Sequence, residues 1–310
     1  MPELAELERA VDRYVESSKA DNTLLAYGKQ WAAFEAWCLT KAACALPATP
    51  ETVALYLAAC AGAGLAAVTL AQAKAVLTRK HEDAGHTSPC ASPLVKQAWA
   101  GIRRRLGVAP NQKQPLDADQ IRAMYAALPT GVLGLRDRAL IGLGFAGGFR
   151  RSELVALDVG DLSFVARGLE ALVRRSKTDQ EGRGLTKNVS RGADPTTCTV
   201  RAVQDWLELS LIADGPVFRA IDRHGNVKQT RLSAQSVALV LKRAADAAGL
   251  PTRDVSGHSL RAGFVTEAKK HGADDAAIMD QTGHKSLAMV QRYHRRARKW
   301  EKPASSKLGL

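Results

Sequence analysis

The sequence predicts an α+β protein that is mainly α-helical, with a small antiparallel β-sheet, organised in two domains. Three observations lead to this prediction. The first hundred residues carry apolar side chains at helical spacing and show no strand pattern. A polar segment with two prolines follows. Beyond it, helical patterns resume and are interrupted by short strand-like runs bounded by turn residues.

The first domain, residues 1–106, is predicted to be a helical bundle. Residues 1–18 have the pattern of an acidic amphipathic helix. A second helix is expected over about residues 23–38, where apolar side chains three and four positions apart share one face. That face consists of Leu24, Tyr27, Trp31, Phe34 and Trp37.

Three further helices complete the predicted bundle. One has Thr49 as its N-cap and Pro50 in its first turn, and it closes on Gly62. The others cover about residues 68–84 and 93–106. The last of them ends in Arg103, Arg104 and Arg105.

A break in the helical pattern separates the two domains. Within residues 107–116, Pro110 and Pro115 flank a run of polar residues, and a new helix begins close to residue 117. We interpret residues 107–116 as an interdomain linker, with an ordinary loop inside one domain as the alternative. The second domain then covers residues 117–310.

The second domain combines helices with short strands. Strand-like runs cover residues 162–165, 170–174 and 185–189. The last two flank SKTDQEGRG, whose aspartate and glycines mark a hairpin turn. Helices are expected over residues 135–144, 199–211, 233–248, 259–271, 274–281 and 286–299.

The composition restricts the class of protein. There are 44 Lys and Arg residues against 31 Asp and Glu, a net charge of +13. This excess suits a polyanion, most often nucleic acid, although a soluble protein with a basic surface is the simpler alternative. No apolar run reaches the ~18 residues of a membrane helix, and no signal peptide is recognisable, so we expect a cytoplasmic protein without a membrane partner. The five cysteines include no CxxC pair, which argues against a disulfide framework or a zinc site.

The segment GGFRRSEL places Arg150 after two glycines and just before a helical turn that contains Glu153. Glu153 can orient Arg150 or Arg151 through an ion pair, and Arg150 can bind a phosphate through two parallel hydrogen bonds. Taken alone, the pair is more simply explained as an ordinary i, i+3 salt bridge.

The segment SGHSLRAGF begins a helix with Ser256 as its N-cap. His258 and Arg261 are three positions apart, so they share one face of the first turn. The free N–H groups at a helix N-terminus favour a bound phosphate. An imidazole and a guanidinium at this position form an anion clamp with a proton shuttle, although an HxxR pair alone arises by chance on many helices.

Three more residues complete the candidates. Lys177 lies in the predicted hairpin turn, where a lysine whose pKa is lowered by neighbouring cations can act as a general acid. A solvated lysine is the alternative at this position. His284 follows Gly283, and Tyr293 lies nine residues after His284, among arginines. Tyr293 is therefore either a packing residue or a nucleophile held against an anion.

Taken together, these residues resemble the pattern of the tyrosine recombinase, or phage integrase, family. That pattern is Gly-hydrophobic-Arg-x-Ser-Glu-Leu, a hairpin lysine, His-x-x-Arg, Gly-His, and a tyrosine nine residues after this histidine. The proportions of the chain are similar to those of Cre-like simple site-specific recombinases. Here the pattern is met by residues 148–154, with Phe149 in place of the commoner leucine or methionine, and by Lys177, His258, Arg261, Gly283, His284 and Tyr293.

The resemblance implies a fold and a reaction. The fold is a helical, SAM-like core-binding domain joined by a linker to a catalytic domain, and together they close on DNA as a C-shaped clamp. The reaction is site-specific DNA recombination through a 3′-phosphotyrosyl intermediate, by integration, excision or resolution. The alternatives are type IB topoisomerase-like relaxation of DNA, or a non-catalytic DNA-binding regulator on the same scaffold.

The resemblance also implies a role for each candidate residue. The expected transition state gathers charge on the phosphate oxygens, and protons move at both the attacking and the leaving oxygen. The implied roles are Tyr293 as nucleophile, Arg150 and Arg261 on the non-bridging oxygens, His284 as a hydrogen-bond partner of the same phosphate, His258 in proton transfer from the tyrosine, Lys177 as the acid for the 5′ oxygen, and Glu153 as support.

The implied partner is a double-stranded DNA site. The chain is expected to be a monomer without DNA and to form a homotetramer that pairs two DNA sites. Because the chain begins with the core-binding helices, short and simple sites are expected. A bacterial, phage or mobile-element origin follows from the same resemblance. No cofactor or metal is expected, since neither HExxH nor GxxxxGK[ST] is present. Contacts to the DNA backbone are expected at Arg103, Arg104, Arg105, Arg174, Arg175 and Arg295, each of which is equally well explained as solvated charge.

Overall fold

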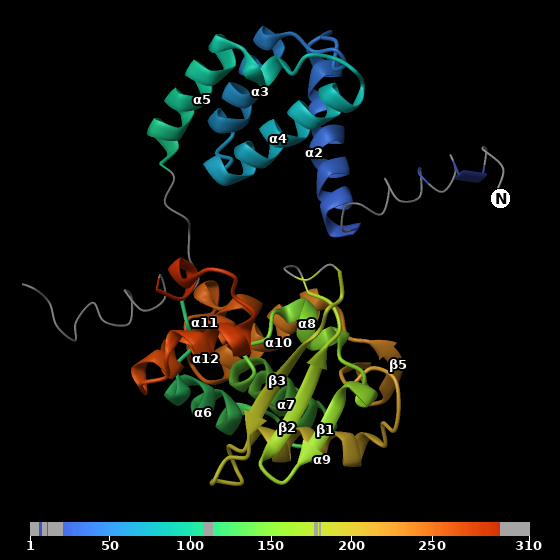
Figure 1. Ribbon diagram of the computed structural model, residues 1–310, viewed down its shortest axis with the longest axis vertical. Helices are drawn as coiled ribbons and strands as arrows, with labels where there is room; N and C mark the ends of the chain where they lie inside the picture. Colours follow the sequence, from blue (N-terminus) through green and yellow to red (C-terminus); the bar gives the residue numbers. More distant parts are fainter. Residues whose placement is uncertain are drawn as a thin grey trace, which may run out of the picture. The chain divides into compact units, whose positions relative to one another are not determined.

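The computed structural model describes residues 6, 7, 11, 21–107, 114–176, 179 and 181–291. The chain divides into two compact units, which we call unit 1 (Met1–Asn111) and unit 2 (Gln112–Leu310) (Figure 1). The boundary falls inside residues 107–116, the segment predicted to be a linker. Each unit has a hydrophobic core of its own.

Unit 1 is a bundle of helices, as the sequence predicted. Two of its helices begin with hydroxyl caps. The Thr49 hydroxyl accepts a hydrogen bond from the Thr52 N–H at 3.2 Å, and the Ser92 hydroxyl accepts one from the Val95 N–H at 3.2 Å. The elements are α2 (Asp21–Thr40), α3 (Pro50–Gly62), α4 (Ala67–Asp83), a 3₁₀ turn (Pro89–Ala91) and α5 (Pro93–Leu106).

The predicted apolar face of α2 is buried at only one end. Phe34 is fully buried, and its ring meets that of Tyr56 edge to face, with 5.0 Å between the ring centroids. At the other end Leu24 is 42% exposed, and Leu25 beside it is also exposed. Leu24 thus belongs to the predicted apolar face but stays outside the core, because the described elements do not cover this end of α2.

Unit 2 contains most of the helices that the sequence predicted. The Asp117 carboxylate caps α6 by accepting from the Gln120 N–H at 2.8 Å, and the Gln120 side chain accepts from the Asp117 N–H in return. Residues 287–291 also have helical conformation, and the rest of the helix expected over 286–299 lies outside the described residues. The helices are α6 (Ala118–Ala127), α7 (Val132–Ala146), α8 (Arg151–Ala156), α9 (Thr199–Ser210), α10 (Ala234–Ala247), α11 (Gly257–Lys270) and α12 (Asp275–Thr282).

The predicted antiparallel sheet is confirmed. Its strands are β1 (Leu162–Val165), β2 (Gly168–Val173) and β3 (Leu185–Ser190), in the order β1-β2-β3. In the hairpin of β2 and β3, Val173 pairs with Leu185 beside the turn. The described residues of the SKTDQEGRG segment therefore lie at this end of the hairpin.

A second hairpin, of β4 (Arg219–Ile221) and β5 (Val227–Arg231), was not predicted. The sequence gives little sign of it, because β5 is mostly polar and largely exposed. Its turn is held by Asp222, which accepts from the Asn226 N–H at 3.0 Å and pairs with Lys228 at 2.7 Å. Local polar contacts therefore replace the apolar alternation that identifies a strand.

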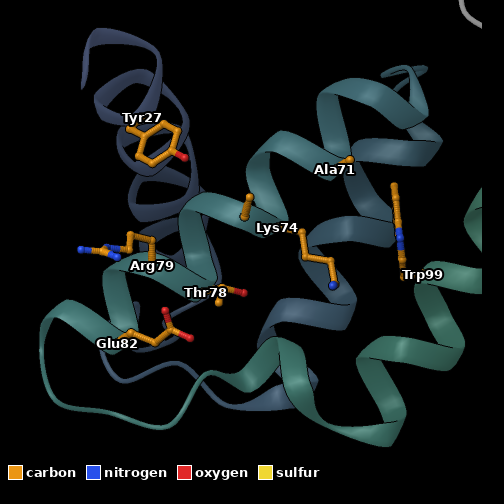
Figure 2. Close-up of a pocket in the computed structure, with 8 residues that line it drawn as sticks. Tyr27, Ala71, Lys74, Thr78, Arg79, Glu82 and Trp99 are labelled. Atoms are coloured by element: carbon orange, nitrogen blue, oxygen red, sulfur yellow. The ribbon is translucent and has the colours of Figure 1, made fainter. Parts of the chain in front are cut away.

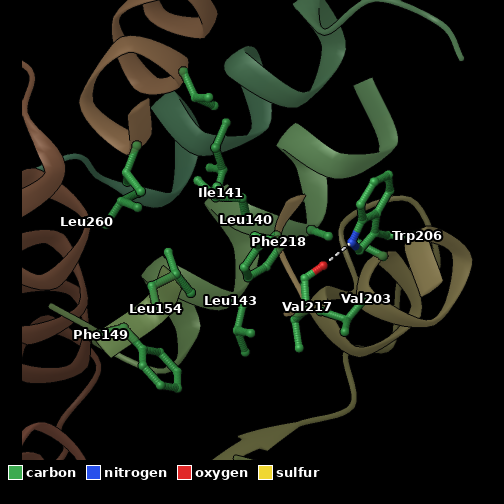
Figure 3. Packing of buried hydrophobic residues seen from close by; sticks show 14 of the residues in the cluster. Leu140, Ile141, Leu143, Phe149, Leu154, Val203, Trp206, Val217, Phe218 and Leu260 are labelled. Atoms are coloured by element: carbon green, nitrogen blue, oxygen red, sulfur yellow. Dashed lines mark hydrogen bonds between the residues drawn. The ribbon is translucent and has the colours of Figure 1, made fainter. Parts of the chain in front are cut away.

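The core of unit 2 supports the segment that carries the candidate site. Helix α7 packs along α9, and the fully buried Trp206 donates from Nε1 to the Val217 carbonyl at 2.8 Å (Figure 3). Phe149 and Leu154, each 1% exposed, belong to the same apolar cluster. These two residues bracket Arg150 and Glu153 and hold their backbone against a packed interior. Among the residues described, every helix is too short or too polar to span a lipid bilayer.

Candidate active site

The site is built around the turn that follows α7. Gly148 has φ of +57°, a left-handed conformation that favours glycine. A Cβ atom there would lie 2.9 Å from the ring of Phe264, so the turn also requires the absence of a side chain. Phe149 then enters the core, and Arg150 stands directly before α8. The turn fixes where the arginine leaves the backbone.

Arg150 and Glu153 form the predicted pair. The Arg150 Nη1 atom donates to Glu153 Oε1 at 2.5 Å, and the Arg150 backbone N–H donates to Oε2 at 3.0 Å. The carboxylate is 2% exposed, whereas the arginine side chain is 18% exposed. Burial alone raises the pKa of Glu153, but Lys187 and Arg150 outweigh burial and hold it below its ordinary value. Glu153 is therefore an ionised group that fixes the guanidinium, and part of the arginine side chain still faces solvent.

Helix α11 brings a second arginine to the same turn. Ser256 caps this helix, since its hydroxyl accepts from the His258 N–H at 3.3 Å. Arg261 is 1% exposed, and its Nη1 atom donates to the Gly148 carbonyl at 2.8 Å. His258, on the same first turn, is exposed. Partial loss of solvent lowers the pKa of His258, and Arg261 and Arg150 lower it further.

His284 reaches the site from the loop after α12. Gly283 ends this helix with φ of +67°, and His284 is 5% exposed. The Thr282 hydroxyl donates its one proton to the Ile278 carbonyl at 2.5 Å and lies 2.8 Å from His284 Nδ1. The histidine must therefore be the donor in that contact. Nδ1 carries the proton, and Nε2 of the neutral ring is an acceptor.

The charges around His284 keep its ring neutral. Burial is the largest cause that lowers its pKa to about 3, followed by Arg261 and Arg150, with His258 and Lys187 contributing less. The two arginines act on both histidines, although they come from different elements. Arg150, His258, Arg261 and His284 thus form one electrostatic cluster.

The structure adds a residue that was not among the predicted site residues. Lys187, in the middle of β3, is fully buried, and its Nζ atom lies 3.5 Å from Glu153 Oε2. Burial lowers its pKa to about 8, Arg261 and Arg150 lower it too, and Glu153 acts in the opposite direction. The sequence contained an indication of this burial. Leu185, Lys187 and Val189 alternate along the strand, so they share its inward face. A lysine on that face is unusual and needs a partner.

The described part of the site carries a net positive charge. The cations Arg150, Arg261 and Lys187 face one carboxylate, that of Glu153, while both histidines are held toward their neutral forms. Such a cluster, partly open at Arg150, suits an anion that presents two or more oxygens, such as a phosphate. Among the residues described, no group of three or more His, Cys, Asp or Glu side chains is placed to hold a metal ion.

Two predicted catalytic residues lie outside the described residues. They are Lys177 and Tyr293. On either side of the lysine, Ser176 and Asp179 exchange two backbone hydrogen bonds of 3.1 Å across the hairpin turn. The description of the carboxyl-terminal helix stops at residue 291, and the predicted DNA contact Arg295 lies beyond it.

The other predicted DNA contacts differ from one another. In unit 1 the arginines at the end of α5 are exposed, and none of the ion pairs found among the described residues includes them. In unit 2, Arg174 and Arg175 are both exposed, and Arg174 pairs with Asp161 at 2.6 Å. The exposed set consists of Arg103, Arg104, Arg105, Arg174 and Arg175.

Unit 1 also has a hollow of about 430 Å³ between α2, α4 and α5. Figure 2 shows Tyr27 from α2 and Trp99 from α5 on either side of a row of α4 side chains. The lining carries both signs of charge, from Lys74, Arg79 and Glu82. None of the predicted catalytic residues that the structure describes lines this hollow.

Known proteins resemble the chain in sequence. The profile of the phage integrase family matches residues 114–299. An integrase/recombinase xerD homolog of Selenomonas ruminantium is 40% identical over 285 residues, which cover 91% of this chain and 83% of that protein. Tyrosine recombinase XerC of Syntrophus aciditrophicus (strain SB) is 33% identical over 187 residues, or 57% of this chain and 55% of that protein.

Solved structures share the fold. A lambda integrase dimer bound to a COC′ core site matches 96% of this chain and 78% of its own with a TM-score of 0.66 at 19% identity. The XerH site-specific recombinase bound to a palindromic difH substrate matches 83% of this chain and 72% of its own, with a TM-score of 0.57 at 16% identity. The α+β fold predicted from the sequence is confirmed. With a family profile over more than half of its length and a close relative over most of it, this chain belongs to the tyrosine recombinase (phage integrase) family.

Proposed function

We propose that this protein is a site-specific DNA recombinase that cleaves and rejoins DNA through a covalent link between Tyr293 and a 3′ phosphate. The observation that carries the proposal is the convergence of Arg150, Arg261 and His284, which are distant in the sequence, on one positively charged turn. Family membership supports the same reaction.

The two arginines suit the hardest part of this reaction. Attack on a phosphodiester adds negative charge to the non-bridging oxygens while a poor leaving group departs. Arg150 and Arg261 bind these oxygens and are already held in place by Glu153 and the Gly148 carbonyl. One preorganised donor of this kind is worth about 100- to 1,000-fold in rate.

The proposed step forms one bond and breaks one. The phenol oxygen of Tyr293 bonds to phosphorus, and the bond from phosphorus to the 5′ oxygen breaks. His258 assists the removal of the phenol proton, and Lys177 gives a proton to the departing 5′ oxygen. The phosphotyrosyl link keeps the energy of the broken bond, so the 5′-hydroxyl of a second DNA strand can attack it and restore a continuous strand.

His284 takes a role that its hydrogen bonds define. In the neutral ring Nε2 accepts, so this atom cannot donate to a phosphate oxygen until it is protonated. A bound phosphate anion raises the pKa of the ring, since an opposite charge favours the charged form. We therefore assign His284 as a group that takes up a proton from solvent at Nε2 when the phosphate binds, and that then donates a hydrogen bond from Nε2 to a phosphate oxygen.

DNA binding and assembly belong to the same proposal. The exposed arginines at the end of α5 are suited to backbone phosphates, which position a protein on DNA without reading its sequence. A relative of the same fold has been solved as a lambda integrase tetramer bound to a Holliday junction, with a TM-score of 0.64. We propose that units 1 and 2 clamp one duplex and that four copies pair two sites.

Covalent trapping on a nicked duplex tests the function. The probe is a set of nicked duplexes taken from DNA that flanks the reading frame, because loss of a short 5′ fragment makes cleavage irreversible. Wild-type protein is expected to form an adduct that survives detergent, and Tyr293→Phe is expected to form none while retaining DNA binding. Tyr27→Phe serves as the matched control and should react like the wild type.

Two outcomes would contradict the proposal. A detergent-resistant adduct with Tyr293→Phe would show that another residue is the nucleophile. Adduct formation without any exchange of strands between two sites, together with relaxation of plasmids of unrelated sequence, would identify a topoisomerase instead.

A further inference from the structure

Lys187 occupies a position that the strand pattern reserves for an apolar side chain. In β3 the exposed residues Thr186, Asn188 and Ser190 alternate with inward-facing ones, and Lys187 is the inward residue with 0% exposure. Taking an ammonium group out of water costs free energy unless partners compensate for the missing solvent. Its partners should therefore reveal why a lysine stands there.

All of the contacts found for the Lys187 ammonium are with the turn that carries Arg150. Nζ donates to the Gly147 carbonyl and to the Gly148 carbonyl, both at 3.2 Å. It lies 3.5 Å from Glu153 Oε2 and 4.6 Å from the centre of the Phe149 ring. One side chain thus binds the backbone before Phe149 and the carboxylate after it.

Two of these partners are shared with the arginines of the site. The Gly148 carbonyl also accepts from Arg261 Nη1 at 2.8 Å. Glu153 also accepts from the Arg150 side chain and backbone. The ammonium is therefore one contact away from each of the two guanidinium groups, although it comes from a different strand.

We infer that Lys187 is a positioning residue that holds Arg150 and Arg261 in the geometry required to bind one phosphate. It fixes the Gly148 carbonyl for Arg261 and Glu153 for Arg150, and its positive charge balances the buried carboxylate. This inference rests on the proposed function. It also distinguishes Lys187 from the general acid, because a fully buried ammonium held by three oxygens is not placed to protonate a leaving group.

The main variant is Lys187→Met, which keeps an unbranched side chain only one atom shorter and removes its charge. Single-turnover cleavage of a nicked duplex at saturating protein should slow by about 10- to 100-fold, the usual effect of losing a group that orients a reacting one. Affinity for a half-site duplex should be unchanged, because most of that affinity comes from contacts elsewhere on the backbone. Val189→Ala is the matched control, since Val189 faces inward on the same strand and its side chain carries no polar group. Its folded fraction should cleave at the wild-type rate.

A double-mutant cycle with Glu153→Gln separates positioning from general destabilisation. If Lys187 acts through Glu153, the variant Lys187→Met/Glu153→Gln should cleave no more slowly than the slower single variant. Losses that multiply would overturn the inference, as would wild-type cleavage by Lys187→Met. If Lys187→Met does not fold, the double variant is compared with Glu153→Gln alone. The double variant should still fold, because it has no buried carboxylate left without its ammonium partner. Because the contact of Lys187 with the Gly148 carbonyl is lost only in the double variant, that variant should cleave more slowly than Glu153→Gln, and equal rates would overturn the inference.

The cleavage chemistry gives a second readout. On a substrate with a 5′ sulfur as the leaving atom, which needs no proton, Lys187→Met should be as defective as on ordinary DNA. Restoration of cleavage on this substrate would identify Lys187 as the acid and overturn its positioning role. Failure of the wild-type protein to cleave would instead contradict the proposed function.

The same double-mutant cycle, measured by equilibrium unfolding, tests the Lys187–Glu153 contact without any cleavage assay. Each variant changes the unfolding equilibrium constant by some factor. The product of the two single-variant factors should exceed the factor measured for the double variant by about tenfold, as expected for residues in contact. Independent effects on unfolding would overturn the inference whatever the cleavage data.

Discussion

Replacing Thr282 by valine removes one oxygen atom beside His284 and keeps the shape of the side chain. In the wild-type site the hydroxyl accepts the Nδ1 proton at 2.8 Å and donates to the Ile278 carbonyl at 2.5 Å. Thr282 is fully buried and His284 is 5% exposed, so water does not replace the missing oxygen. The valine variant must either leave the Nδ1 proton unpaired or move that proton to Nε2.

The size of the effect follows from the cost of an unpaired buried donor. That cost is about 1–3 kcal/mol. The ring form that accepts at Nε2 becomes rarer by the corresponding factor, roughly 5- to 150-fold. The proposed imidazolium form is disfavoured similarly, since it also donates from Nδ1. Cleavage by Thr282→Val should slow by a factor in this range.

The assay is single-turnover adduct formation at saturating protein, with ¹⁵N NMR of the histidine ring to report which nitrogen carries the proton. Thr282→Ser is the matched control, because it keeps the hydroxyl and should retain both the wild-type tautomer and rate. Wild-type cleavage by Thr282→Val, with the proton on Nε2, would show that His284 acts only as a donor and would refute the reasoning. Equal defects in the serine and valine variants would show that the hydroxyl is not what the site requires and would also refute the reasoning.

Two more predictions concern residues named from the sequence. Lys177→Ala should block cleavage of ordinary DNA far more than cleavage of a duplex with a 5′ sulfur at the break, because a sulfur leaving group needs no proton. Equal defects on both substrates would mean that Lys177 is not the acid. Replacement of Arg103, Arg104 and Arg105 by alanine should lower the slope of half-site affinity against salt, on logarithmic axes, by about 0.9 for each phosphate that the variant no longer binds. An unchanged slope in a gel-shift titration would show that these exposed arginines do not contact DNA.

The helices and the β2–β3 hairpin could be predicted from sequence because their signals are local. In α3, Thr49 caps the first turn and Pro50 occupies it, and both act within one turn of chain. The hairpin was recognisable because apolar runs flank a turn rich in aspartate and glycine. The β4–β5 hairpin escaped prediction because its polar strand is fixed by contacts of Asp222 that have no periodic signature.

Much of the candidate site was also local. The ion pair of Arg150 with Glu153 spans three residues at the start of a helix, and the HxxR motif places His258 and Arg261 on the first turn of α11. The order of these motifs along the chain was enough to predict the family, which the comparisons confirm. Such features could be predicted because each depends on neighbours within a few positions.

Only the tertiary structure decided how these local pieces act together. No spacing in the sequence reveals that the Gly148 carbonyl binds Arg261, or that the Thr282 hydroxyl fixes the tautomer of His284 through its own bond to Ile278. The alternation of residues along β3 indicated that Lys187 is buried. The carbonyl groups that Lys187 binds, however, lie about forty residues earlier in the chain. Sequence patterns specify which face of an element is buried, whereas the packing of distant elements determines which polar groups meet there and therefore which charges and protons the site holds.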